Sequence, residues 1–563
     1  MKARSFISIV VGIATILIST SGMCDLTRSQ KISDAETLIS LFKHRYAPIL
    51  WKKDYLGISV DDLAGELLGE AYRTGGTDED FYAAMARMAG GMKDTHIWFI
   101  IPSHYMTHLG FYCDYVEGRA LIDYISRSSN PENNFPFKRG DELISIDGIP
   151  VEEILEDLAQ YDSHGSQLAE KRFLTQALTI RPQRKFAHVP TGESVLEIFS
   201  QDRGKSETVT IHWFEQNDPL PNTADPEARV SKYNIGSSAD IELQSDDALE
   251  DLKNLRWSAL LEEKAIEAGI GNRTPFFPLW KSFKKITEQP LLSGTFKLDG
   301  RTIGFIRIPT WHPPSSAPWY KFFEEQIPYF QKNTDAIVID QTNNGGGNLC
   351  LANDIAGYFV SAPIPNLLFH IRANNKRLVM YEGYANECKR YGKNQPKYCP
   401  IITRIANSIR KAITEGDALT EPLPLCVDDG LIHPAKDKNG KQIVYTKPVL
   451  LLANEWSISA ADMFPATLQD ADRIEVFGEQ TCGAGGSVIT SDYMGFTDFR
   501  VSQTETLAVR SREVVTTDGV RTRYLENAGV IPDIHYSITV DDFMNGYEEY
   551  RNAVDAALRT IVR

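Results

Sequence analysis

Residues 336–347, AIVIDQTNNGGG, join a run of apolar residues to three consecutive glycines. A short apolar run rich in β-branched residues is typical of a buried strand. Glycine loses more conformational freedom on folding than any other residue, so three in a row need a structural reason. Two interpretations stay open: the glycines form a turn that leads into a helix, or they let backbone N–H groups approach a bound group closely.

The sequence around this stretch alternates between strand and helix patterns. "TIGFIRIPTW" and "KPVLLLAN" read as strands, whereas "WYKFFEEQIPYFQKN" and "SAADMFPATLQDA" have apolar residues at helical spacing. Alternation of this kind is typical of an α/β sheet. We therefore predict an α/β core over residues 293–540 and a C-terminal helix over residues 541–563.

The chain before this core changes character twice. Residues 25–96 have apolar residues at three- and four-residue spacing, which predicts a helical N-terminal region. Residues 97–216 contain short strand-like runs such as "RALIDYI" and "DELISIDGIPV", which predict a β-rich domain. Residues 217–292 open with a segment rich in Pro, Asn, Ser and Asp, which is typical of a linker. The prediction is an α/β multidomain protein.

The N-terminus has the pattern of a signal peptide. Lys2 and Arg4 precede the apolar run "FISIVVGIATILIS", and the small polar "TSG" follows it. This run is shorter than the roughly 20 residues of a spanning helix. We predict a signal peptide over residues 1–24 and export to the periplasm, the medium or a host cell, without membrane association after signal removal. An uncleaved anchor is the alternative.

Charge and cysteine content exclude some classes of function. The net charge of −16, with no long block of one sign, argues against nucleic acid as a partner. Seven cysteines in 563 residues are too few for a fold built on disulfides. Cys388 and Cys399 flank a polar loop, and a disulfide or two free thiols fit equally well. No His or Cys cluster has zinc spacing, so we predict no metal and no cofactor.

Two serines lie where a buried strand, "VLLLAN", turns into a helix. Ser457 and Ser459 are each suited to cap the helix or to act as a nucleophile beside its free N–H groups. A serine nucleophile needs a base, and a histidine would serve. His96, in "KDTH", is one candidate, and spacing alone does not separate it from its rivals, which are His44, His104, His108 and His312.

Four motifs, in order, resemble the tail-specific or C-terminal processing serine peptidases, family S41. "FKRGDELISIDGIPVEEIL" resembles the PDZ-like domain of that family, "RIPTW" its early core strand, "DQTNNGGG" its glycine segment and "ANEWSISAADMFPATLQD" its nucleophile segment. The resemblance covers about residues 35–540. It implies Ser459 as nucleophile, with Ser457 as second choice. It also implies an oxyanion hole formed by the Gly346 and Ala460 amides.

One departure separates this chain from the common branch of the family, which uses a Ser–Lys dyad. The matching stretch, "TCGAGG", has Ala484 in the lysine position. The chain therefore resembles the lysine-less branch, which includes tricorn and the chlamydial protease-like activity factor. In that branch "KDTH" supplies the histidine, His96, and "LENAGVIPD" the glutamate, Glu526. Glu526 would orient His96 directly or through Thr95 or a water, and Asp94 is an alternative partner for the histidine.

The resemblance implies an exported serine endopeptidase that hydrolyses protein or peptide substrates. It also implies a self-cleaving zymogen, cut within residues 217–292. A non-catalytic binding protein on the same fold and a hydrolase of small esters are the alternatives. The oligomeric state stays open, with a homodimer as one alternative.

Overall fold

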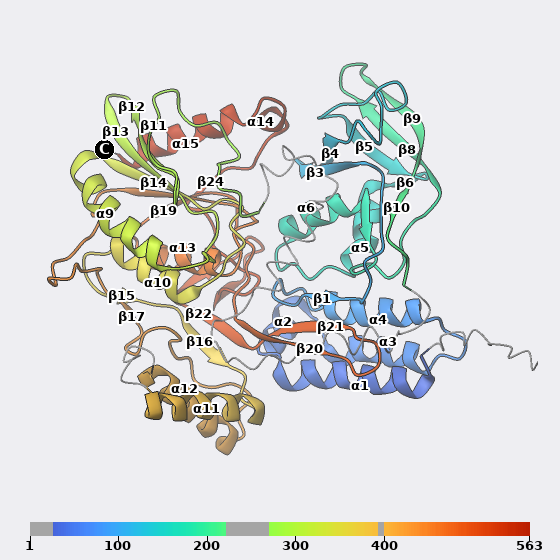
Figure 1. Cartoon of the computed structure of the whole chain (residues 1–563), viewed down its shortest axis with the longest axis horizontal. Helices are drawn as coiled ribbons and strands as arrows, with labels where there is room; N and C mark the ends of the chain where they lie inside the picture. The colour runs from blue at the N-terminus through green and yellow to red at the C-terminus, as the bar shows by residue number, and fades with distance from the viewer. Residues whose placement is uncertain (1–25, 221–269, 392–398, 563) are drawn as a thin grey trace, which may run out of the picture.

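The computed structural model describes residues 26–220, 270–391 and 399–562. The predicted signal peptide and most of the predicted linker lie outside these ranges. Within them, none of the helices combines the length and apolar character that a membrane crossing requires. Figure 1 shows a helical region (blue), a β-rich domain (cyan to green) and a larger mixed region (green to red), so the predicted α/β multidomain architecture is confirmed.

Four helices make up the described part of the N-terminal region: α1 (Arg28–Arg45), α2 (Ile49–Leu56), α3 (Val60–Tyr72) and α4 (Asp78–Gly90). Thr27, Ser59 and Thr77 cap α1, α3 and α4, because each side chain accepts a hydrogen bond from the backbone N–H three residues later. The apolar sides of these helices pack together and against Phe499 and Val501. The N-terminal region is therefore anchored on residues that are distant in the sequence.

The second region is an antiparallel sheet with two helices packed against it. Its strand order is β3-β4-β5-β8-β9, with β6 paired to β5. The strands are β3 (Phe111–Val116), β4 (Arg119–Ile125), β5 (Glu142–Ile146), β6 (Ile149–Pro150), β8 (Glu193–Ser200) and β9 (Lys205–His212), and the helices are α5 (Val151–Ala159) and α6 (Gln167–Ala177). A smaller sheet, β10-β2-β7, consists of β10 (Phe214–Gln216), β2 (Met106–His108) and β7 (Ile180–Pro182).

The third region is built on a seven-stranded sheet with the order β11-β12-β13-β14-β18-β19-β24. The strands are β11 (Lys284–Thr287), β12 (Ser293–Leu298), β13 (Arg301–Arg307), β14 (Ala336–Asp340), β18 (Val449–Ala453), β19 (Glu475–Gly478) and β24 (Ile534–His535). The strands from β13 to β24 are parallel, and β11 and β12 form an antiparallel edge. Strand β11 lies within residues 217–292, so the sheet starts earlier than the linker prediction placed it.

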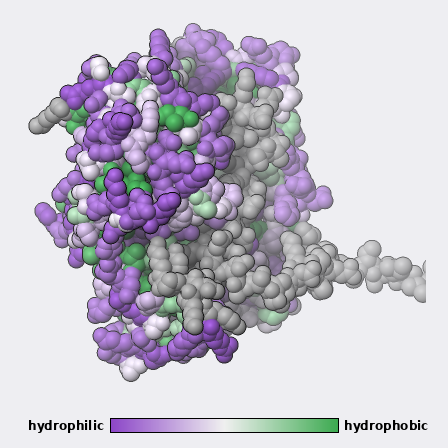
Figure 2. Space-filling view, turned by 60° about the vertical axis from the view of Figure 1, so that its left-hand side comes forward, coloured by the Kyte–Doolittle hydropathy of each residue, from purple (hydrophilic) through white to green (hydrophobic). Residues whose placement is uncertain are grey.

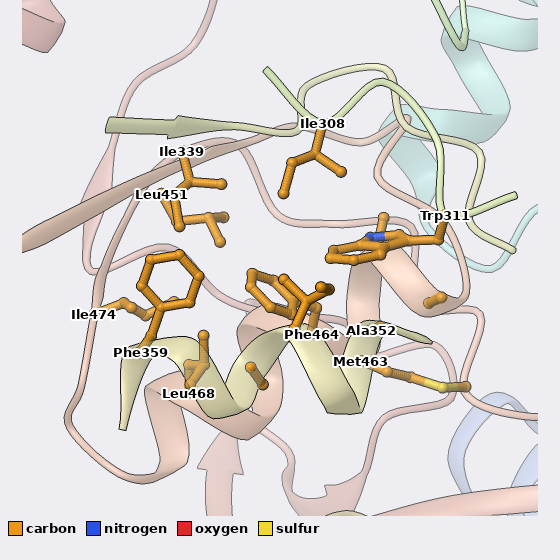
Figure 3. Close-up of a cluster of buried hydrophobic side chains, with 14 of the residues drawn as sticks. Ile308, Trp311, Ile339, Ala352, Phe359, Leu451, Met463, Phe464, Leu468 and Ile474 are labelled. Carbon is orange, nitrogen blue, oxygen red and sulfur yellow. The ribbon is translucent and has the colours of Figure 1, made fainter. Parts of the chain in front are cut away.

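Helices cover both faces of this sheet. On one face, α9 (Ala317–Asn333), α10 (Leu349–Ala356), the short helix η2 (Gly357–Phe359) and α13 (Ala460–Asp470) enclose the largest apolar cluster. Figure 3 shows part of it, with Phe464 of α13 between Phe359 and Trp311. On the other face, α15 (Glu548–Ile561), which follows the short α14 (Val540–Met544), packs through Val554 and Leu558. Both faces of the parallel strands are buried, as their continuous apolar sequences predict.

Three smaller sheets and a helical hairpin complete the described chain. Strand β1 (Phe99–Ile100) pairs with β21 (Arg500–Thr504), which pairs with β20 (Val488–Tyr493). The other sheets are β16-β22-β23, from β16 (Leu368–Ile371), β22 (Thr506–Val515) and β23 (Arg521–Tyr524), and β15-β17, from β15 (Ile364–Pro365) and β17 (Leu431–Ile432). The hairpin consists of α11 (Asn375–Tyr391) and α12 (Cys399–Glu415). Although β1 falls in the predicted β-rich domain, it pairs with a strand of the third region.

Two disulfide bonds crosslink the third region. Cys388 and Cys399, left open by the sequence, form a bond across the α11–α12 hairpin. Cys350 and Cys426 form a second one, which was not predicted. The face in Figure 2 is dominated by hydrophilic residues, with hydrophobic ones in small separate patches among the coloured atoms.

Candidate active site

The two candidate serines have different environments at the turn between β18 and α13. Ser457 is fully buried, and its hydroxyl donates to the Gln341 carbonyl oxygen at 3.1 Å and accepts from the Asn454 N–H at 3.2 Å. Ser459 is partly exposed. Its φ of 59° is left-handed, which is unfavourable for a residue other than glycine and marks a sharp, strained strand-to-helix turn. Of the two hydroxyls, that of Ser459 is therefore the one that a substrate can reach.

A buried carboxylate, Asp462, holds this turn in place. Its Oδ2 accepts from the Ser459 N–H at 2.6 Å and from the Ala484 N–H at 3.1 Å, and its Oδ1 accepts from the Gly483 N–H at 2.8 Å. Burial raises the pKa of Asp462 to about 6, although these hydrogen bonds oppose the rise. Asp462 was not predicted as a site residue. The signal for it was its place three residues after the serine, where an acidic side chain can bond the N-cap amide.

The glycine segment packs directly against the Ser459 turn. Gly346 has a φ of +91°, and a β-carbon there would lie 2.5 Å from the Ile458 carbonyl oxygen and 2.8 Å from the Ser459 Cβ. A β-carbon on Gly347 would lie 2.4 Å from the Trp311 backbone. Close backbone approach to the serine turn and to the segment after β13 therefore explains these two glycines.

The two amides predicted to form an oxyanion hole lie on facing segments but are not equally available. The Gly346 N–H donates to the Asn344 Oδ1 at 2.9 Å. The Ala460 N–H, the first amide of α13, has no acceptor within the ranges that the structure describes. Helix N-termini leave such amides unpaired, ready for an anionic group.

Asp94, Thr95 and His96 lie in the connection between α4 and β1. Asp94 is fully buried, with Oδ1 accepting from the His96 N–H at 2.9 Å and Oδ2 accepting from the Tyr46 hydroxyl at 2.8 Å. The His96 Nδ1 is buried without a hydrogen-bond partner among the described residues. Burial lowers the pKa of His96, Lys52 lowers it further, and Asp94 opposes both. A histidine in this setting is neutral at neutral pH, as a base must be.

Thr95 does not contact Glu526 in this structure. Its hydroxyl accepts from the Gly165 N–H at 3.0 Å and lies 3.1 Å from the Cys482 Sγ. Thr95 therefore joins the His96 connection to the β-rich domain and to the loop after β19, and no relay through it is present.

Glu526 is fully buried after β23, and both of its oxygens have partners. Its Oε1 lies 2.5 Å from the Lys52 Nζ, and its Oε2 accepts from the Gly485 N–H at 2.9 Å. Burial raises the pKa of Glu526, Asp94 raises it further, and Lys52 opposes the rise. Lys52, on α2, was not predicted as a site residue, because nothing in the sequence separates it from its neighbour Lys53.

The structure links the predicted residues of the N-terminal region to those of the third region through a series of contacts. The loop with Ala484, in the position of the family lysine, contacts Asp462 on one side and, through Gly485, Glu526 on the other. Asn527 links this loop region to the connection that carries His96, because its Nδ2 donates to the Lys93 carbonyl oxygen at 2.9 Å. No hydrogen bond joins Ser459, His96 and Glu526 to one another in the described chain.

One rival histidine, His108, is placed elsewhere. It lies in β2 and stacks on Phe214 of the neighbouring strand, with ring centroids 5.3 Å apart. Within the described ranges, no group of three or more His, Cys, Asp or Glu side chains could hold a metal ion.

Comparison with known proteins identifies two domains. The profile of "Peptidase family S41" matches residues 302–536, and that of "PDZ domain" matches residues 105–227. The chain is 26% identical over 585 residues to a protein of Chlamydia trachomatis, covering 93% of this chain and 91% of that protein. It is also 23% identical over 604 residues to a protein of Chlamydia pneumoniae, covering 95% and 91% of the two chains.

Solved structures agree in fold. The structure of mature CPAF complexed with lactacystin matches with a TM-score of 0.73 and 24% identity, covering 95% of this chain and 99% of that chain. A crystal structure of mature CPAF matches with a TM-score of 0.74 and 23% identity, covering 95% and 98%. The resemblance seen in the sequence is confirmed: residues 302–536 match an S41 domain of the serine-type peptidase class, and a PDZ domain precedes it.

Proposed function

We propose that this protein is an exported endopeptidase that hydrolyses protein substrates through an acyl-enzyme on Ser459, with His96 as base and Glu526 as the carboxylate. The observation that carries the proposal is the Ser459 turn. It combines a partly exposed hydroxyl, a left-handed φ and the close approach of Gly346. Protein substrates follow from the peptidase family.

In the proposed reaction, His96 takes the Ser459 hydroxyl proton while the oxygen bonds to the substrate carbonyl carbon. His96 then gives this proton to the leaving amine as the C–N bond breaks. A water molecule next loses a proton to His96 and attacks the ester, and the proton returns to Ser459. The Ala460 N–H, joined by the Gly346 N–H, stabilises the oxyanion, and Glu526 stabilises the imidazolium, directly or through Thr95 or a water.

Two groups have to change partners before this reaction. The Gly346 N–H must leave the Asn344 side chain, and His96 must gain hydrogen bonds to the Ser459 hydroxyl and to the carboxylate, because none of these contacts for catalysis is present in the described chain. Catalytic hydrogen bonds commonly tighten only when substrate is bound. Such a resting arrangement also fits a zymogen, with the proposed cut within residues 217–292.

The described end of that range supports a link between cutting and the site. The Gly271 N–H donates to the Asn343 carbonyl oxygen at 2.7 Å, beside the glycine segment. Arg307, whose guanidinium donates to the Thr342 carbonyl oxygen at 2.6 Å, also donates to the Asn272 carbonyl oxygen at 2.9 Å. A cut upstream of residue 270 would free one end of a segment that contacts the residues preceding the glycines. Residues 221–269 themselves lie outside the described ranges.

The test is labelling with a fluorophosphonate, read by intact mass, on the wild type and on Ser459→Ala, His96→Ala and Ser457→Ala. We expect one adduct on the wild type and none on Ser459→Ala. His96→Ala should label about 10²- to 10⁴-fold more slowly, the usual contribution of a general base. Ser457→Ala is the matched control and should keep its adduct, because its hydroxyl is a buried structural donor.

Three results would count against the proposal. An adduct that persists in Ser459→Ala and disappears in Ser457→Ala would make Ser457 the nucleophile in place of Ser459. A wild type that stays unlabelled, even after limited proteolysis between residues 220 and 270, would favour a non-catalytic binding protein. Labelled protein that hydrolyses a nitrophenyl ester but no denatured protein would favour an esterase. Lactacystin, which is bound in one CPAF structure, serves as a second probe.

A further inference from the structure

Lys52 is a fully buried cation on α2, a helix whose other residues are exposed or half-buried. Its side chain has no exposed surface, whereas its neighbour Lys53 is exposed. Removing an ammonium group from water is costly unless charged and polar partners replace the water. The partners of Lys52 therefore indicate why it is inside.

All three donors of the Lys52 ammonium are used, and each acceptor belongs to the candidate active site or adjoins it. The Nζ donates to the Glu526 Oε1 at 2.5 Å, to the Lys93 carbonyl oxygen at 2.6 Å and to the Asn527 Oδ1 at 2.7 Å. Lys93 lies three residues before His96, and Asn527 follows Glu526. One side chain thus ties the histidine connection to the glutamate loop.

Lys52 is also the counter-charge for two buried carboxylates. The carboxylate of Glu526 contacts it directly, and that of Asp94 is near enough to raise the pKa of Glu526. The other titratable groups near this cluster are the Tyr46 hydroxyl, which donates to Asp94, His96, and the Cys482 thiol, whose pKa burial raises and Glu526 raises further. The ammonium of Lys93 points elsewhere, since it donates to the Ala159 and Asp162 carbonyl oxygens and pairs with Glu170.

We propose that Lys52 is a positioning residue of the active site, which holds the Glu526 side chain in place, opposes its protonation and fixes the His96 connection to it. This inference rests on the proposed Ser459–His96–Glu526 mechanism. Lys52 acts through Glu526, and it touches neither Ser459 nor a substrate. The opposite role, in which Lys52 withholds Glu526 from His96, predicts the opposite effect on the labelling rate.

The experiment measures the rate of fluorophosphonate labelling from pH 5 to pH 9 for Lys52→Met, Lys52→Arg and the exposed control Lys53→Met. Side chains that orient metal-binding residues contribute roughly 10- to 100-fold, and by analogy we expect Lys52→Met to label at least about tenfold more slowly at pH 7. Without the cation, the pKa values of Glu526 and His96 both rise, so the rising limb of the pH profile should move to higher pH. Lys53→Met should match the wild type, and Lys52→Arg should restore most of the rate.

A second comparison separates positioning from mere stability. Lys52→Met leaves a buried carboxylate unpaired, and if that protein does not fold, the double variant Lys52→Met/Glu526→Gln carries the test, because it has neither charge. Since Lys52 is proposed to act through Glu526, the double variant should label at the rate of Glu526→Gln alone. A further tenfold loss in the double variant would overturn the inference.

The remaining outcomes separate a failure of this inference from a failure of the proposed function. A Lys52→Met protein with the wild-type rate and pH profile overturns this inference and leaves the proposed function intact. A faster Lys52→Met protein means that Lys52 withholds Glu526, which also overturns it. Wild-type labelling by Glu526→Gln removes Glu526 and this inference together, while Ser459 and His96 stand. A wild type without any adduct, even after limited proteolysis between residues 220 and 270, refutes the proposed function itself.

Discussion

Replacing Asp462 by asparagine tests how the Ser459 turn is held. Burial raises the pKa of Asp462 from its ordinary value of 3.8 to about 6, so the folded protein binds this proton more tightly than the unfolded chain. The stability contributed by the protonated carboxyl is fully present below pH 3.8 and is lost as the pH rises through about 6. At about 1.4 kcal/mol for each pKa unit, ionising this carboxyl costs about 3 kcal/mol of unfolding free energy by pH 8.

The assay is urea unfolding of the aspartate and asparagine proteins at several pH values, both in a Ser459→Ala background so that the proposed self-cleavage cannot occur. Relative to the asparagine protein, the aspartate protein should lose about 2 to 3 kcal/mol of unfolding free energy between pH 4 and pH 8. Asp472→Asn is the control, because that side chain is exposed just after α13 and its replacement should change the pH dependence little. A difference that is constant with pH, or that grows with pH, would show that the three amides outweigh burial and would refute the assigned direction.

Three further predictions concern packing and crosslinks. Gly346→Ala places a β-carbon 2.5 Å from a carbonyl oxygen at a φ of +91°. The rate of labelling should fall at least about 100-fold, which is the range for losing an oxyanion donor, while circular dichroism shows a folded protein. Labelling at the wild-type rate would contradict this prediction. Removing the Cys350–Cys426 disulfide, which has a sequence separation of 76, should lower the unfolding free energy of the core by about 4 kcal/mol. Calorimetry without reductant measures this change, and an unaltered melting temperature of the core would refute the prediction. In the wild type the Arg172 guanidinium lies 2.6 Å from the buried Glu455 carboxylate, and Arg172→Met removes this partner. The unpaired carboxylate should lower the unfolding free energy by about 3 to 5 kcal/mol and separate the melting of the PDZ domain from that of the core. An unchanged single transition would contradict this prediction.

The local features of the fold could be predicted from the sequence. A buried strand that ends in glycines and a second strand that ends in serines have strong local patterns, and parallel strands bring their ends to one edge of a sheet. The choice between Ser457 and Ser459 could not be made from spacing, because both lie in the same turn and burial separates them. The family resemblance supplied His96 and Glu526, which composition alone did not.

The missed features depend on contacts between residues far apart in the chain. Lys52 and Lys53 look alike in the sequence, and the orientation of α2 on its neighbours turns one of them inward. The pairing of Phe99 with Val501, and the bond between Cys350 and Cys426, likewise join residues that no local pattern connects. Such long-range pairings are fixed by the assembled core rather than by local propensity.

The pairing of β1 with β21 has a consequence for a chain cut between residues 220 and 270. His96 and Lys52 would then belong to one fragment, and Ser459 and Glu526 to the other, so neither fragment alone would contain all the proposed catalytic residues. The fragments would still be joined by the β1–β21 pairing, by the Ala47 N–H donating to the Thr504 carbonyl oxygen at 2.9 Å, and by the buried Lys52–Glu526 ion pair. We therefore expect complementation: two separately expressed polypeptides, one ending and the other beginning between residues 220 and 270, should reassemble into one active protein when they are mixed or produced together.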